Sequence, residues 1–135
     1  PGALTEALTA LRKHTTGKLY CIFGCGGDRD VGKRPLMGKA AEIGADSVII
    51  TTDNSRSETP ESIANDILDG MQFPQQVICE PDRETAIRQC LSSASPGDLI
   101  LVAGKGHEDY QIILGQRNNY NEREVVARMQ QELCQ

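Results

Sequence analysis

Two spacings of hydrophobic residues alternate along the 135-residue chain. Segments with apolar residues three or four positions apart predict helices, and Thr59 and Asp82 can cap two of them. The helices are expected over about 3–14, 35–44, 60–71, 83–94 and 121–133. Between them lie short runs that are apolar at almost every position, as in strands covered on both faces. The strand candidates are KLYCIF (18–23), SVIITT (47–52), QQVICE (75–80), DLILVA (98–103) and YQIIL (110–114).

Helices and buried strands in alternation predict a mostly parallel sheet covered by helices. We therefore expect a doubly wound, Rossmann-like α/β domain, with 110–114 as an antiparallel edge strand. In such sheets ligands bind beyond the carboxyl ends of the strands. The loops expected there are GCGGDRDVGK, DNSRSE, EPD and GKGHEDY, and three of them are rich in glycine, charged residues or both. The functional site is expected where these loops meet.

Composition narrows the classes of function. The net charge of −5 argues against a general nucleic-acid binder. No apolar run approaches the roughly 20 residues that cross a bilayer, and no signal-peptide pattern opens the chain. Five scattered cysteines are typical of reduced, mostly buried thiols in a cytoplasmic protein, and no second pair or His cluster joins Cys21 and Cys25 as metal ligands. We expect a cytoplasmic domain that binds no metal, membrane or nucleic acid.

The first loop contains G-x-x-x-x-G-K at 27–33, the outline of a phosphate-binding loop. A true phosphate loop continues with a Ser or Thr that holds magnesium, whereas Arg34 stands there in this chain. Two aspartates inside the loop would also repel a phosphate chain. The dinucleotide fingerprint fails too, because Arg29 occupies the place of its third glycine. Two interpretations remain: a solvated turn, or a loop that projects Arg29 and Lys33 from a strand end.

The other two loops supply complementary charges. Arg56 in DNSR offers a planar fork to a carboxylate, although these residues also suit an ordinary turn. In AGKGHED, Gly104 permits close backbone approach, Glu108 carries negative charge, and His107 is either a surface residue or a hydrogen-bonding one. Two guanidiniums and one carboxylate at the same rim suit a ligand that has carboxylates and an ammonium group. A dicarboxylic amino acid fits this description better than a nucleotide does.

The stretches FGCGGDRDVGKRPLMGKAAE, DNSR and VAGKGHEDYQ closely resemble the C-terminal domain of the Mur ligases, above all of the branch that adds 2,6-diaminopimelate. The resemblance covers essentially the whole chain. This family builds bacterial peptidoglycan precursors in the cytoplasm, and so serves cell-wall biogenesis, cell shape and cell division. The resemblance implies that residues 1–135 form the C-terminal, amino-acid-binding domain of a three-domain ligase. The N-terminal domain and the central ATP-binding domain would lie outside this chain.

The resemblance also implies the reaction of the whole enzyme. The D-glutamate carboxylate of UDP-MurNAc-L-Ala-D-Glu is phosphorylated by ATP, and the amino group of meso-diaminopimelate attacks the acyl phosphate. Magnesium ions stabilise the phosphoryl groups, and positioning supplies much of the catalysis. ATP and Mg²⁺ would be bound mainly by the absent central domain. We therefore expect no catalytic residue and no metal ligand in this chain, and no activity of the domain alone.

Carried over by position, the resemblance assigns roles to individual residues. Arg29 would bind one carboxylate of diaminopimelate, and Arg56 the carboxylate at the distal stereocentre. Gly104, through its backbone, and Glu108 would bind the distal ammonium group. The implied substrate-binding residues are Arg29, Asp53, Asn54, Ser55, Arg56, Gly104 and Glu108, with Lys33 and His107 in supporting roles.

One position departs from the family pattern. Ser55 replaces the proline of the D-N-P-R recognition motif, but serine can keep the turn through its own hydrogen bonds, so Arg56 is expected to remain placed. Lysine-adding relatives lack this arginine because lysine has no distal carboxylate, and Arg56 therefore favours diaminopimelate. Three alternatives remain open: a lysine-adding or other Mur-type domain, a stand-alone module that binds a diamino acid, and an independent nucleotide-binding protein that uses 27–33.

Overall fold

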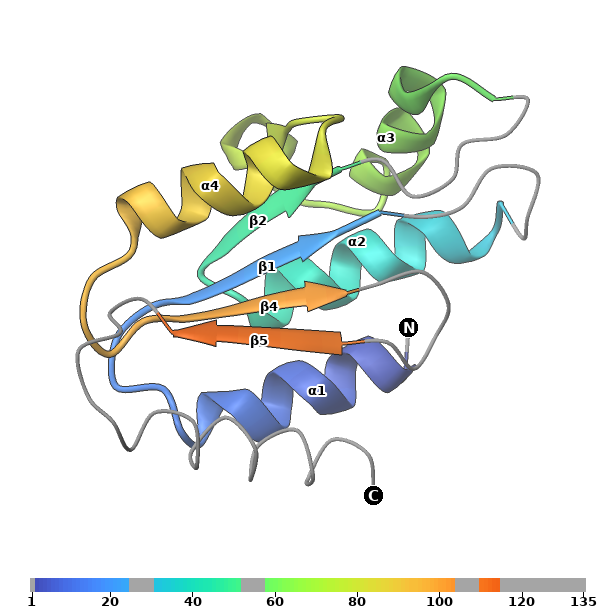
Figure 1. The fold of residues 1–135 in the computed structure, drawn as a ribbon. Helices are drawn as coiled ribbons and strands as arrows, with labels where there is room; N and C mark the ends of the chain where they lie inside the picture. Colours follow the sequence, from blue (N-terminus) through green and yellow to red (C-terminus); the bar gives the residue numbers. More distant parts are fainter. Residues whose placement is uncertain (1, 25–30, 52–57, 104–109, 115–135) are drawn as a thin grey trace.

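The computed structural model describes residues 2–24, 31–51, 58–103 and 110–114, which form a five-stranded sheet with helices on both faces (Figure 1). The helices are α1 (Gly2–Arg12), α2 (Lys33–Gly44), α3 (Pro60–Leu68) and α4 (Arg83–Ser93), with a 3₁₀ turn, η1, at Pro74–Gln76. The strands are β1 (Leu19–Phe23), β2 (Ser47–Ile50), β3 (Ile78–Cys79), β4 (Leu99–Ala103) and β5 (Tyr110–Leu114).

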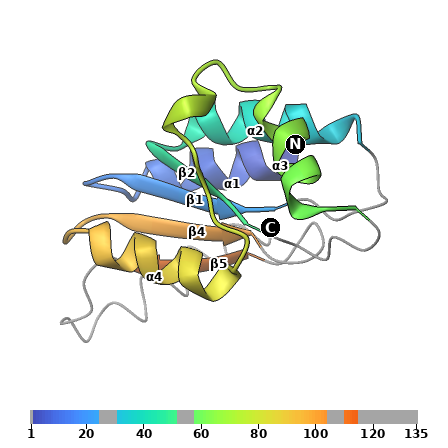
Figure 2. The ribbon, with the colours of Figure 1, turned by 90° about the horizontal axis from the view of Figure 1, so that it is seen from above.

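The sheet has the strand order β3-β2-β1-β4-β5. The first four strands are parallel, and β5 runs antiparallel to β4 at the edge. Helices α1, α2 and α3 pack on one face, whereas α4 packs on the other and carries the chain from β3 across to β4 (Figure 2). The doubly wound α/β fold with an antiparallel edge strand is thereby confirmed.

Each central strand divides its side chains between two cores. In β1, Leu19, Cys21 and Phe23 face α1, α2 and α3, whereas Tyr20 and Ile22 face α4. All five side chains are buried. Because both faces are covered, the strand is apolar at every position, and each buried large apolar side chain contributes about 1.5–3 kcal/mol.

Side-chain caps begin two of the helices. The hydroxyl of Thr59 accepts a hydrogen bond from the Ser62 N–H at 3.1 Å, ahead of Pro60 in the first turn of α3. The carboxylate of Asp82 accepts one from the Thr85 N–H at 3.2 Å at the start of α4. Both caps confirm the sequence prediction, and each is worth about 1 kcal/mol.

Helix α2 buries, at least in part, three of the four residues predicted on its apolar stripe: Met37, Ala40 and Ala41. Leu36 is the exception at 53% exposed, and Arg34 and Gly38 are buried as well. Gly38 lets the backbones of α2 and α3 approach closely, because a Cβ added there would lie only 2.2 Å from the carbonyl oxygen of Ile67. This close approach turns the side with Arg34 and Gly38 toward α3 and leaves Leu36 in solvent.

The third strand is shorter than predicted. A strand was expected over 75–80, but the chain forms η1 first and pairs with β2 only at Ile78–Cys79. Both residues of β3 are exposed, so this edge strand lacks the buried apolar contacts that stabilise the longer strands. The helix expected over 121–133 lies outside the described residues.

The described cysteines are Cys21 and Cys90, which are buried, and Cys79, which is exposed; none of the three forms a disulfide. Burial raises the pKa of Cys21 to about 12 and that of Cys90 to about 11, so both stay protonated at neutral pH. Two of these three thiols thus match the expected reduced, buried state. Cys79 differs because β3 lies exposed at the edge of the sheet.

Candidate functional site

The loops that were expected to form the site follow three neighbouring strands. Phe23 at the end of β1 pairs with Ile50 at the end of β2, and Ile22 pairs with Val102 near the end of β4. The three parallel strands therefore end at the same edge of the sheet (Figure 1). Between β1 and β4 the helical connections change from one face to the other, which is where doubly wound sheets bind ligands.

Most of the predicted site residues lie outside the described part of the chain. They are Arg29, Asp53, Asn54, Ser55, Arg56, Gly104, His107 and Glu108. Lys33 is described: it is the first residue of α2 and its side chain is exposed. The structure thus shows the strand ends and helix starts that flank the three loops, and two arginines among these flanking residues make contacts that bear on the site.

Arg34, the residue after Lys33, is 1% exposed. Its Nη1 donates hydrogen bonds to Glu58 Oε2 and Asp66 Oδ2, and its Nη2 donates to Glu58 Oε1, each at 2.8 Å. The guanidinium therefore grips Glu58 with both arms of its fork, the strongest geometry for such a pair. The hydrogen bonds from Arg34 to Glu58 and Asp66 raise the pKa of Arg34, although burial opposes them, so this side chain stays charged.

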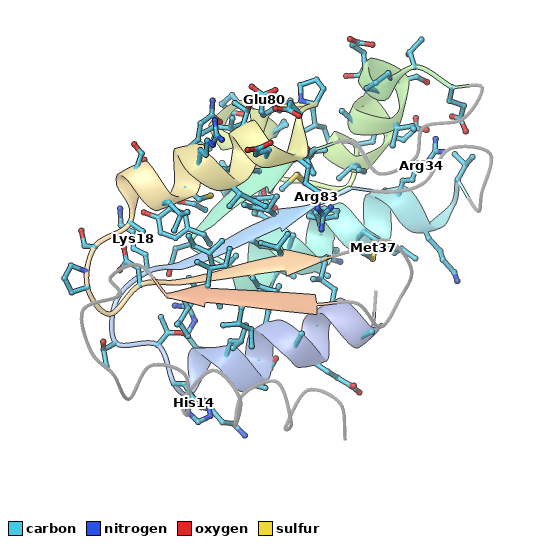
Figure 3. The ribbon with its side chains drawn as sticks, viewed as in Figure 1. His14, Lys18, Arg34, Met37, Glu80 and Arg83 are labelled. Atoms are coloured by element: carbon cyan, nitrogen blue, oxygen red, sulfur yellow. The ribbon has the colours of Figure 1, made fainter. Side chains whose placement is uncertain are left out.

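This cluster joins the starts of two helices. Arg34 belongs to the first turn of α2, Glu58 stands two residues ahead of α3, and Asp66 lies within α3. Figure 3 shows Arg34 between α2 and α3. Each helix start follows one of the predicted recognition loops, so the cluster connects the points at which the chain returns from both loops.

Arg83, the first residue of α4, supports the third loop from the other face of the sheet. Its Nη2 donates a hydrogen bond to the carbonyl oxygen of Ala103 at 2.8 Å, at the last residue of β4. Its Nη1 is buried and has no hydrogen-bond partner among the described residues. Figure 3 shows Arg83 between α4 and the sheet, at the carboxyl end of β1. A positive charge is thus held beside the strand end that leads into 104–109.

The sequence prediction missed the roles of Arg34 and Arg83. In the sequence, Arg34 only indicates that 27–33 is not a phosphate loop, because it replaces the Ser or Thr that would bind magnesium. In the structure it lies on one buried side of α2 with Gly38 and Ala41. An arginine on a stripe that is otherwise small and apolar was a usable signal. For Arg83 no such signal exists, because a first-turn arginine is usually solvated and only the structure shows its contact with β4.

The described residues contain no group of three or more His, Cys, Asp and Glu side chains that could hold a metal ion. None of the helices in this part of the chain has the length and apolar character needed to cross a membrane.

Known proteins resemble this chain in sequence and in structure. A family model described as the Mur ligase, glutamate ligase domain matches residues 1–106. The UDP-N-acetylmuramoyl-L-alanyl-D-glutamate–2,6-diaminopimelate ligase of Haemophilus ducreyi is 50% identical over 128 residues, which are 95% of this chain and 26% of that protein. A solved structure of a ligase with the same name superposes with a TM-score of 0.72 and 44% identity, over 98% of this chain and 27% of the other. The chain thus spans about a quarter of the length of these relatives.

Proposed function

This chain belongs to the Mur ligase family through its glutamate ligase domain, and on this premise we propose that it is the amino-acid-binding domain of an ATP-dependent ligase. The ligase adds meso-diaminopimelate to UDP-MurNAc-L-Ala-D-Glu in the bacterial cytoplasm. Two likenesses support the substrate: 50% identity to one diaminopimelate ligase and 44% identity to another of known structure. The observation that carries the proposal is the meeting of three strand ends at one edge of the sheet, each followed by a loop with a recognition motif.

The domain supplies one part of the reaction. Residues 1–135 form the C-terminal domain, and two other domains bind the UDP-sugar precursor and ATP with Mg²⁺. The small share of the relatives that this chain covers supports this division. The described residues contain no cluster that fits Mg²⁺, and the two carboxylates near the start of α2 are engaged by Arg34. In this proposal the chain's own task is to bind and orient the amino acid.

The proposed binding residues match the charges of diaminopimelate one by one. Arg29 and Arg56 pair with its two carboxylates, and a guanidinium can meet a carboxylate with two parallel hydrogen bonds. Glu108 and the backbone of Gly104 hold the distal ammonium group. The amino group at the other end is left free to attack the activated D-glutamate carboxyl group, where a nitrogen–carbon bond forms as phosphate leaves. Holding the nucleophile in this orientation is the catalytic contribution of the domain.

Lysine is the competing substrate, because Ser55 departs from the family's recognition motif. Lysine lacks the distal carboxylate, so it would leave the charge of Arg56 without a partner. An unpaired charge in a closed site is costly, and this cost is the basis of the proposed preference for diaminopimelate.

The proposal is tested by product formation in the full-length protein that contains this chain. The protein is incubated with ATP, Mg²⁺ and UDP-MurNAc-L-Ala-D-Glu in the presence of either meso-diaminopimelate or lysine. The products are identified by mass spectrometry. We expect the diaminopimelate adduct, and no phosphate release by the 135-residue chain alone. Lysine as the better substrate would refute the specificity, and ATP turnover by the isolated chain would refute the division into domains.

A further inference from the structure

The charged cluster of Arg34, Glu58 and Asp66 places a buried guanidinium against two partly exposed carboxylates. Arg34 is buried between two packed helices, and taking such a charge out of water is expensive. A buried ion pair typically adds no more stability than apolar residues of the same size, whereas its hydrogen bonds define one geometry. The cluster is therefore better suited to fixing a spacing than to stabilising the domain.

The spacing that it fixes lies between the residues at which the chain returns from the two arginine-bearing loops. Arg34 comes four residues after the end of 25–30, and Glu58 comes directly after 52–57, two residues beyond Arg56. The two 2.8 Å hydrogen bonds of the fork set both the distance and the angle between the Arg34 guanidinium and the Glu58 carboxylate. The ends of the two loops are thus held against each other by one rigid pair.

Further contacts hold Glu58 and Arg34 in place. Glu58 directly precedes Thr59, whose hydroxyl caps α3, so the backbone at Glu58 is tied to the start of a helix. Besides its two hydrogen bonds to Glu58, Arg34 donates one to Asp66, which lies within α3. The close contact of α2 and α3 at Gly38 adds a backbone constraint to the same pair of helices.

We propose that Arg34 and Glu58 are positioning residues of the amino-acid site. By joining the start of α2 to the residue ahead of Thr59 and α3, they fix the two points at which the chain returns from the arginine-bearing loops, and so support binding of the amino acid. The inference rests on the proposed function. It assigns Arg34 a role unrelated to the phosphate loop that its neighbours resemble. A plain structural role is the rival explanation: the cluster would then only hold α2 against α3.

The two explanations differ in what Glu58 and Asp66 do. Both carboxylates bond to the same guanidinium nitrogen at 2.8 Å, and both are partly exposed. Glu58 adjoins the loop, however, whereas Asp66 lies inside α3. Asp66→Asn is therefore a matched control for Glu58→Gln, since each removes one carboxylate charge from Arg34 and only the second changes the residue that follows 52–57.

The experiment measures KM for the amino acid, KM for ATP, kcat and the thermal midpoint in the full-length ligase. We expect Glu58→Gln to raise KM for diaminopimelate about tenfold while KM for ATP changes less than about twofold. Asp66→Asn should keep both KM values within about twofold of those of the unsubstituted enzyme, even if it lowers the thermal midpoint as much as Glu58→Gln does. Glu58→Asp, which keeps the charge and the two-oxygen fork, should recover part of the lost affinity, whereas Arg34→Lys, which lacks the planar fork, should resemble Glu58→Gln.

The outcomes separate this inference from the proposed function. Equal effects of Glu58→Gln and Asp66→Asn on stability, with KM for diaminopimelate unchanged, would overturn the positioning role. A rise of every KM together in Glu58→Gln would overturn it too, because that indicates a general loss of structure. If the unsubstituted enzyme used lysine, the proposed specificity would be wrong, and the same comparison with lysine would still decide the role of Glu58. An enzyme that used no amino acid would refute both.

Discussion

Substituting Gly38 with alanine tests how tightly α2 and α3 are held together. In a solvated helix this change is favourable by about 1 kcal/mol, because alanine has the higher helix propensity. In this chain the added Cβ would lie 2.2 Å from the carbonyl oxygen of Ile67, about 1.2 Å short of the 3.4 Å at which ordinary contact begins. The obstructing atom is backbone within α3, so relief requires a shift of the helix and not of a side chain.

The steric cost is expected to exceed the gain in propensity. Forcing one extra carbon into a packed contact costs about 1–3 kcal/mol, and an overlap with backbone belongs near the upper end of that range. We therefore expect Gly38→Ala to lower the free energy of unfolding by about 1–2 kcal/mol. For a chain of this size the thermal midpoint should fall by about 4–8 °C.

The assay is thermal and urea unfolding of the 135-residue chain, followed by circular dichroism. Gly2→Ala serves as the control, because Gly2 also belongs to a helix but a Cβ there meets nothing within 4 Å. The control should change the midpoint little. A midpoint for Gly38→Ala equal to or above that of the unsubstituted chain would show that α3 yields freely, and would remove the backbone constraint invoked for the Arg34 cluster.

Two further predictions concern titratable groups. Burial raises the pKa of Cys21 to about 12 and that of Cys90 to about 11, so neither should react with iodoacetamide at neutral pH until the chain unfolds. Burial also raises the pKa of Cys79, but this residue is exposed, so it should be labelled first of the three. Peptide mass spectrometry checks this order, and equal labelling of all three would contradict the buried cores. Asp46 accepts hydrogen bonds from Leu19 N–H and from the Arg12 guanidinium, which outweigh burial and lower its pKa below the ordinary 3.8. The ionised Asp46 therefore stabilises the fold fully above pH 3.8, and this stabilisation is lost as the pH falls through the lowered pKa of the folded state. In urea unfolding measured at several pH values, Asp46→Asn should reduce the acid-induced loss of stability by about 1 kcal/mol or less. An unchanged dependence of stability on pH would refute this.

The fold could be predicted where local pattern and tertiary structure agree. β1 and β4 are apolar throughout because both their faces are covered, and this burial makes them visible in the sequence. Thr59 and Asp82 were identified because a cap is a local interaction between residues three positions apart. β3 was predicted too long because its pairing at an exposed edge depends on neighbours that the local pattern does not contain.

The same reasoning predicted the edge of the sheet at which the candidate loops begin, but not the contacts that flank them. The position of the three loops at one edge follows from the alternation of helices and parallel strands, and the structure places β1, β2 and β4 side by side as required. The position of Arg34 on a helical stripe was visible in the sequence, but its partners could not be predicted because they lie 24 and 32 residues away. The predicted ligands in 25–30, 52–57 and 104–109 remain predictions, since they lie outside the described residues.

Calorimetry on the full-length protein tests the central claim most directly, with meso-diaminopimelate and lysine as ligands and Arg56→Ala beside the unsubstituted protein. A charged hydrogen-bonded pair is worth about 1.5–3 kcal/mol, so Arg56→Ala should weaken diaminopimelate binding by about tenfold or more. Lysine binding should become tighter, because the substitution removes the charge that lysine leaves unpaired. The unsubstituted protein should prefer diaminopimelate. Equal diaminopimelate affinity in both proteins, or a preference for lysine, would contradict the account.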